Sequence, residues 1–178
     1  MKNTAAVICF LTTVIPGLSM AQLGYGPVEG DRELSVAGTG SSESDFDNGS
    51  FGITGDMGWY FRDNMVAGVR QSINYASIEG ASLNDDFWNG ATRGYLNYQF
   101  GSSQWRPFVG GSLGLIYGDG VNNSGFAGVE LGVKYYVLAK TYILARLDYQ
   151  WFFDDAEDLD DTFDDGAWQN TVGIGFNF

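Results

Sequence analysis

The sequence contains no histidine, only one cysteine, three prolines and nine basic residues. Without histidine, the serine–histidine and aspartate–histidine arrangements of hydrolases and acyltransferases are excluded, because no side chain with an ordinary pKa near neutral pH is present. A carboxylate pair could still act as acid and base, but the acidic clusters lie in segments whose composition predicts solvated loops. We therefore expect no enzymatic activity, no cofactor and no catalytic residues.

The single cysteine, Cys9, lies in an N-terminal segment that has the pattern of a secretory signal. Lys2 supplies the positive charge, residues 5–15 form a short apolar run, and Ser19-Met20-Ala21 is an acceptable cleavage site. The apolar run is shorter than the ~20 residues that a membrane-spanning helix needs. We predict a cleaved signal peptide over 1–21 and a domain over 22–178 that no disulfide stabilises.

Basic residues are few beside 22 acidic ones, so the formal net charge is −13. Removal of residues 1–21 leaves 8 basic and 22 acidic residues and a net charge of −14. A surface this acidic disfavours nucleic-acid binding, because it repels phosphate. No later segment approaches 18 consecutive apolar residues, which excludes a transmembrane helix.

Residues after position 30 alternate between apolar and polar side chains, a period typical of β-strands. The connections alternate between short turns and longer loops, as in up-and-down barrels of the outer membrane. The sequence therefore predicts an all-β fold, an eight-stranded antiparallel up-and-down transmembrane β-barrel. We expect its strands at 32–42, 50–62, 65–77, 88–101, 105–117, 124–138, 141–153 and 167–178.

Alternation alone does not distinguish a membrane barrel from a soluble one such as a lipocalin. The polar phase is rich in glycine, which suits a narrow interior better than a solvated sheet surface. The apolar phase carries aromatic residues at the strand ends and aliphatic ones between them, as in the aromatic girdles of membrane barrels. The core of a soluble barrel would not separate the two kinds of residue along the strands. One expected girdle contains Phe51, Tyr75, Trp88, Tyr117, Phe126, Trp151 and Trp168. The other contains Trp59, Phe61, Tyr98, Phe100, Trp105, Tyr135, Phe176 and Phe178.

The inward phase predicts an interior charge network near mid-height. Its members are Glu33, Asp56, Arg70, Arg93, Glu130, Lys134, Arg146 and Asp148. Four acids and four bases in a confined space should pair, because an unpaired buried charge is costly. Either Glu130 faces Asp148 or Lys134 faces Arg146, and each register gives one opposite-charge diagonal. A salt-bridged plug is favoured over a narrow polar or proton-conducting pore, because eight strands leave room for little more than side chains.

Acidic residues concentrate in the expected long loops. Residues 154–167 contain eight carboxylates and no base, and further acids occur at 43–47 and 79–86. The spacing does not match the EF-hand loop, so no specific metal site is expected. A bare solvated surface is the simplest reading. Divalent cations that bridge these loops to lipopolysaccharide phosphates are the alternative.

The chain ends on "NTVGIGFNF", in which Val172, Ile174, Phe176 and Phe178 alternate with small or polar residues. Together with the signal pattern, the eight strands and the girdles, this ending resembles the small outer-membrane β-barrel family that includes OmpX and the membrane domain of OmpA. The resemblance covers about residues 22–178. In that family a C-terminal aromatic preceded by alternating hydrophobics is read by the barrel assembly machinery, which implies an assembly signal at these four positions.

The resemblance implies a monomer in the bacterial outer membrane, in contact with outer-membrane lipid and lipopolysaccharide. It also implies an interior charge network of the same kind as the one expected here. The OmpA type continues into a periplasmic peptidoglycan-binding domain, whereas this sequence stops at the last expected strand, so the resemblance does not imply a cell-wall tether. Two functions remain open: a structural or surface-interaction barrel with acidic extracellular loops, or a small porin-like channel or transporter. Residues 22–30 lie either in the periplasm or across the base of the barrel.

Overall fold

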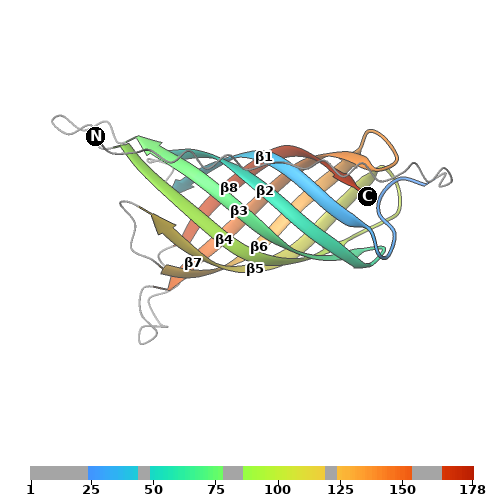
Figure 1. Ribbon diagram of the computed structural model, residues 1–178, viewed down its shortest axis with the longest axis horizontal. Coiled ribbons are helices and arrows are strands. Elements are labelled where there is room, and N and C mark those ends of the chain that lie inside the picture. Colours follow the sequence, from blue (N-terminus) through green and yellow to red (C-terminus); the bar gives the residue numbers. More distant parts are fainter. Residues whose placement is uncertain (1–23, 44–48, 78–85, 119–123, 154–165) are drawn as a thin grey trace, which may run out of the picture.

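The computed structural model describes residues 24–43, 49–77, 86–118, 124–153 and 166–178. They form a closed antiparallel barrel of eight strands, which confirms the predicted fold class (Figure 1). Each expected strand lies within two residues of the observed one. The strands are β1 (Arg32–Glu43), β2 (Gly49–Arg62), β3 (Met65–Ser77), β4 (Asp86–Gln99), β5 (Trp105–Gly118), β6 (Ser124–Tyr136), β7 (Thr141–Phe153) and β8 (Gly166–Asn177).

Every strand pairs with its two neighbours, and β1 closes the barrel by pairing with β8. At the seam, the backbone N–H of Arg32 donates to the carbonyl of Phe178 at 2.8 Å, and that of Phe178 donates to Arg32 at 2.9 Å. A closed ladder leaves no strand edge, so the backbone polar groups of the strands bond to one another. The same closure holds the strands together without a disulfide. The residues that the structure describes contain no helix able to cross a membrane.

The short turns and the C-terminus lie at one end of the barrel, on the right of Figure 1. Gly101, at φ +77°, lies in the turn between β4 and β5, a backbone conformation that favours glycine. Residues 44–48, 78–85, 119–123 and 154–165, which include most of the expected acidic loops, lie outside the described residues.

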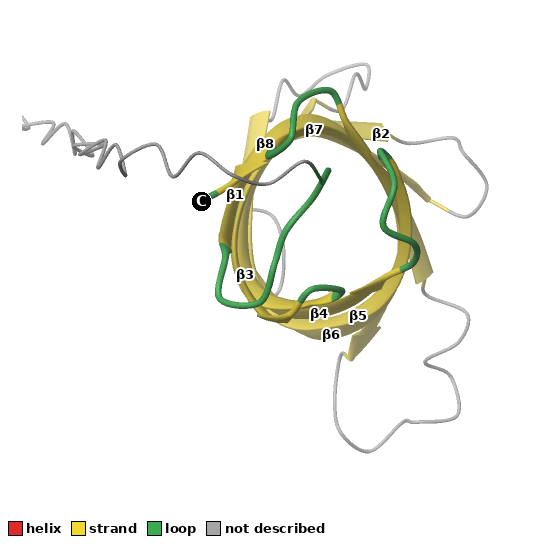
Figure 2. Ribbon diagram, turned by 90° about the vertical axis from the view of Figure 1, so that its right-hand side faces the viewer, coloured by secondary structure: helices red, strands yellow, loops and turns green. Residues whose placement is uncertain are grey.

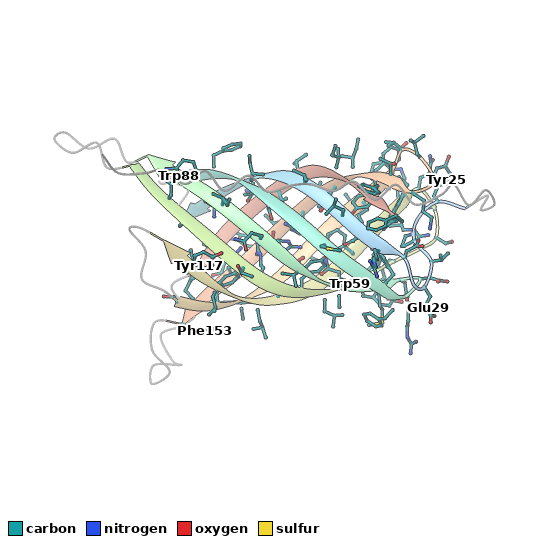
Figure 3. All side chains as sticks on the ribbon, in the orientation of Figure 1. Tyr25, Glu29, Trp59, Trp88, Tyr117 and Phe153 are labelled. Atoms are coloured by element: carbon teal, nitrogen blue, oxygen red, sulfur yellow. The ribbon has the colours of Figure 1, made fainter. Side chains whose placement is uncertain are left out.

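The two faces of each strand differ sharply in burial. On β7, Leu144, Arg146 and Asp148 are buried, whereas Ile143 and Leu147 point outward and are exposed. The same alternation places large aliphatic and aromatic side chains around the outside of the barrel (Figure 3). The apolar set therefore faces outward and the charged set inward, the reverse of an ordinary soluble protein.

Aromatic side chains mark both ends of this outer surface. Figure 3 shows Trp88 and Tyr117 toward one end and Trp59 toward the other. Phe126 is an exception to the expected girdle, because it is only 2% exposed and points into the lumen. It shares the inward phase of Gly128 and Glu130, and Arg93 lies over its ring at 5.7 Å. The side chain of Tyr75 lies outside the described residues.

Large aromatic side chains also fill the interior, although the sequence suggested room for little beyond glycine and a few charges. Phe108 and Tyr142 are almost fully buried there. Each lies against a glycine on the neighbouring strand: a Cβ at Gly132 would lie 2.4 Å from the Phe108 ring, and one at Gly175 would lie 2.5 Å from Tyr142. The inward glycines therefore make space for rings and do not leave the lumen empty.

Candidate functional site: the charged interior

Arg70, on β3, lies at the centre of the interior and is fully buried. Its Nε donates to Asp56 Oδ1 at 2.9 Å, and its Nη1 and Nη2 donate to the two carboxylate oxygens of Glu130 at 2.6 and 3.2 Å. A bidentate guanidinium–carboxylate pair is among the strongest side-chain hydrogen bonds. The guanidinium also lies 4.7 Å from the centre of the Tyr95 ring. Arg70 thus links β2, β3, β4 and β6 across the lumen.

Arg146, on β7, forms the second centre of this layer. Its Nε donates to Asp148 Oδ2 at 3.0 Å, and its Nη1 donates to Asp56 Oδ2 at 2.9 Å. Asp56 therefore bridges Arg70 and Arg146, one with each carboxylate oxygen. Arg93 completes the layer with a contact of 3.8 Å to Asp148 Oδ1 and a hydrogen bond to Gln169. Three arginines balance the three carboxylates of this layer.

The hairpin of β6 and β7 adopts one of the two registers considered from sequence: Glu130 faces Asp148, and Lys134 faces Leu144. Among the described residues, the ion pairs nevertheless do not run along the hairpin diagonal. Arg146 pairs with Asp148 on its own strand, and Glu130 pairs with Arg70 on the opposite wall. The curvature of the barrel brings the opposite wall within reach, so partners come from across the lumen.

A second layer lies closer to the short turns, around the carboxylate of Glu33. Lys134 Nζ lies 2.5 Å from Glu33 Oε2, and the hydroxyls of Tyr60, Tyr95 and Tyr142 donate to the same carboxylate at 2.7, 3.0 and 3.2 Å. The Lys134 ammonium also lies 4.8 Å from the centre of the Tyr142 ring. This buried pair is therefore surrounded by donors and rings that compensate for its desolvation.

All eight side chains of the expected network are buried, and the structure divides them between these two layers. Sequence reasoning missed a ninth buried charge, Arg106 at the start of β5. The alternation of side chains along β5 predicts its inward position, because Arg106 lies an even number of residues from the inward Gly110 and Ser112. Arg106 belongs to neither layer and lies nearest the short-turn end.

The interior is arranged for fixed pairing. Its carboxylates are held by cations or tyrosine hydroxyls, and the side chains around them are almost inaccessible to solvent. Within the described ranges, no three metal-ligating side chains come together. These pairs therefore link opposite walls of the barrel.

Three polar side chains on the outer face form a closed ring of hydrogen bonds. The hydroxyl of Thr92 donates to Gln71 Oε1 at 2.6 Å, Gln71 Nε2 donates to the Tyr117 hydroxyl at 2.8 Å, and the Tyr117 and Thr92 hydroxyls lie 3.0 Å apart. The second Nε2 proton of Gln71 reaches the carbonyl of Ser72 at 3.2 Å. This ring satisfies its own donors across β3, β4 and β5, as an apolar surrounding requires.

The four residues of the expected assembly signal all point outward from β8 and the residue after it. Val172 and Ile174 are strongly exposed, and Phe176 and Phe178 are exposed at the short-turn end, where their rings pack 5.4 Å apart. Phe178 also closes the seam with β1 through its backbone. This placement leaves the four side chains accessible on the outer surface.

No family model matches the sequence, and no curated protein matches it either. Solved structures share its fold at low sequence identity. The Neisserial surface protein A (NspA) is 18% identical, with a TM-score of 0.60 over 83% of this chain and 96% of that one. The outer membrane protein OprG from Pseudomonas aeruginosa is 12% identical, with a TM-score of 0.64 over 86% of this chain and 98% of that one.

The N-terminal β-barrel domain of Pseudomonas aeruginosa OprF is 19% identical, with a TM-score of 0.56 over 84% of this chain and all of that one. Identities this low establish the architecture and do not carry over residue roles. The closed eight-stranded barrel, its inward charges and its outward apolar belt therefore give this chain the fold of small eight-stranded outer-membrane β-barrels.

Proposed function

We propose that this protein spans the bacterial outer membrane as a closed barrel with a structural or surface-interaction role, after export by a cleaved signal peptide over 1–21. The observation that carries the proposal is the continuous outer belt of exposed apolar side chains around a charged, buried interior. Monomeric soluble proteins rarely expose contiguous apolar patches larger than a few hundred Å². A hydrocarbon surrounding accounts for the belt at every strand.

Contact with outer-membrane lipid and lipopolysaccharide follows from that placement. The alternating residues Val172, Ile174, Phe176 and Phe178 are exposed on the outer face, which supports recognition by the barrel assembly machinery. The acidic segments join strand ends opposite the short turns, where they would face the exterior and could recruit divalent cations beside lipid phosphates. We infer that the protein acts as a monomer, because the closed ladder leaves no strand edge for a partner.

A non-enzymatic role fits the chemistry of the interior. Arg70 and Arg146 hold the central carboxylates in ion pairs, and the Glu33 carboxylate accepts hydrogen bonds from three tyrosines. Groups fixed in this way have no free position for a substrate. With no histidine in the chain, we propose that the barrel is a scaffold for its loops.

The interior supports a plug more strongly than the alternative of a small porin-like channel. Two layers of paired charges cross the lumen, and Phe108, Tyr136 and Tyr142 fill the space near the short-turn end. An ion that crossed the barrel would have to separate buried pairs, which costs several kcal/mol. The paired layers therefore support a structural role in which no solute crosses the barrel.

Planar-bilayer recording of the refolded protein tests this proposal. We expect the wild-type protein to insert without steady channel openings, because the Arg70 and Arg146 pairs block the lumen. Steady wild-type openings whose conductance changes in Arg146→Ala would establish a pore and contradict the plug. Arg62→Ala, at an exposed site of the rim, is the matched control and should leave the recording unchanged.

A further inference from the structure

Residues 24–31, which we call the base strap, cross the short-turn end of the barrel before β1 begins. Figure 2 looks onto this end and shows the strap running over one side of the opening before it joins β1. Three backbone N–H groups tie it to different parts of the rim. Gly26 donates to the carbonyl of Ala139 at 2.8 Å, Gly30 to that of Tyr60 at 2.7 Å, and Glu29 to Asp63 Oδ1 at 2.7 Å.

Arg106 is the main side chain that holds the strap from below. It is 5% exposed, and in the part of the chain that the structure describes it forms no ion pair with a carboxylate. Its Nη2 donates to the carbonyl of Tyr25 at 2.5 Å, and its Nη1 lies 3.4 Å from the carbonyl of Asp63. The guanidinium thus joins the strap to the turn between β2 and β3.

Gly26 lets the strap lie directly on this guanidinium. Its φ of +99° favours glycine, and a Cβ at this position would lie 2.3 to 2.5 Å from three atoms of the Arg106 guanidinium group. Gly24, two residues earlier in the same strap, has no heavy atom within 4 Å of the corresponding position. The two glycines therefore differ in whether an added methyl group would break the contact between the strap and the Arg106 guanidinium.

The attachments of the strap are much weaker than those of the strands. Gly26 and Pro27 are buried, but Tyr25 is 39% exposed and Val28 is only half-buried. A few hydrogen bonds and the Lys140–Asp31 ion pair hold this segment, whereas each strand has a ladder on both sides. Segments with little apolar burial open at lower free energy than the core of a fold.

We propose that the base strap is a lid that lifts while the barrel stays folded, and that the hydrogen bond from Arg106 to the strap holds it closed. Lifting the lid exposes the short-turn side of the Glu33–Lys134 layer, where Gln99 on β4 is 1% exposed and donates to the Tyr60 hydroxyl. It opens no path through the barrel, because the Glu33–Lys134 layer and the arginine layer lie above it. The inference concerns the short-turn mouth and stands whether or not the barrel conducts.

The test measures the access of a water-soluble reagent to the lumen under the strap. In the full chain with Cys9→Ser, Gln99→Cys places a single thiol there, and its reaction rate with a charged maleimide is recorded for protein refolded in lipid vesicles. We expect slow labelling with the strap intact. Gly26→Ala and Arg106→Met should each raise the rate at least tenfold, and Gly24→Ala should leave it within twofold.

Fast labelling with the strap intact, or equal rates for Gly26→Ala and Gly24→Ala, would overturn the lid. Amide hydrogen exchange provides a measurement without any substitution. The amides of Gly26 and Gly30 should exchange at least a hundredfold faster than that of Leu131 in β6, while the barrel remains folded. Equal protection of strap and strand amides would mean that the strap opens only when the barrel unfolds. The bilayer recording is independent of either outcome.

Discussion

Replacing Arg70 with methionine is expected to lower the free energy of unfolding by about 3–5 kcal/mol, or to prevent refolding. Arg70 is fully buried and holds Asp56 and Glu130 through three hydrogen bonds. Methionine fills a similar volume but supplies no charge, so two buried carboxylates lose a partner. Urea unfolding of the protein refolded in lipid vesicles measures the effect.

Two further variants separate the loss of pairing from a general effect of losing arginine. Arg62→Met makes the same change at an exposed site on the rim and should shift the free energy of unfolding by less than about 0.5 kcal/mol. Adding Glu130→Gln to Arg70→Met removes one unpaired carboxylate and should recover part of the loss. If Arg70→Met unfolds within about 1 kcal/mol of the wild type, the charge network does not hold the barrel together.

Replacing Leu131 with arginine is expected to destabilise the barrel by about 2–4 kcal/mol in a bilayer, the range for a cation on the lipid face near mid-membrane. Leu131 is 57% exposed and lies on β6 beside the buried Glu130. Its side chain points away from the lumen, so the new charge would lie in hydrocarbon. The same vesicle-based unfolding experiment measures this change.

Leu138→Arg is the matched control for depth. Leu138 is 64% exposed and lies in the turn between β6 and β7, at the end of the barrel. There an arginine reaches the interface and should cost only about 0–1 kcal/mol. Equal effects at positions 131 and 138 would be inconsistent with an apolar band of limited height.

The strand pattern was largely predictable because two physical rules govern it locally. Side chains alternate between the two faces of a strand, so parity alone separated Glu130 and Lys134 from Leu131. Short turns set the register of three hairpins, β2–β3, β4–β5 and β6–β7, and the strand boundaries agree within two residues. The prediction that Phe126 belongs to the outer girdle is wrong, because its position in the alternation along β6, and not its aromatic character, decides which face it occupies.

The pairing inside the barrel could not be predicted, because it depends on how the closed sheet is staggered. Arg70 and Glu130 are 60 residues apart and come from opposite walls. Their meeting is set by the shear of all eight strands together. The strap follows no alternating pattern, so its contact with Arg106 had no periodic signal in the sequence.

The central claim is that the apolar outer face lies in hydrocarbon, and nitroxide labels along β6 test it most directly. Single labels at Val129, Leu131 and Val133, with one at Leu138 on the rim, are compared in lipid vesicles for collisions with oxygen and with a polar nickel complex. Oxygen partitions into hydrocarbon and the nickel complex stays in water. The account predicts strong oxygen and weak nickel access at Leu131, with the reverse at Leu138. Strong nickel access at all four positions would show a water-exposed surface and contradict the membrane-spanning barrel.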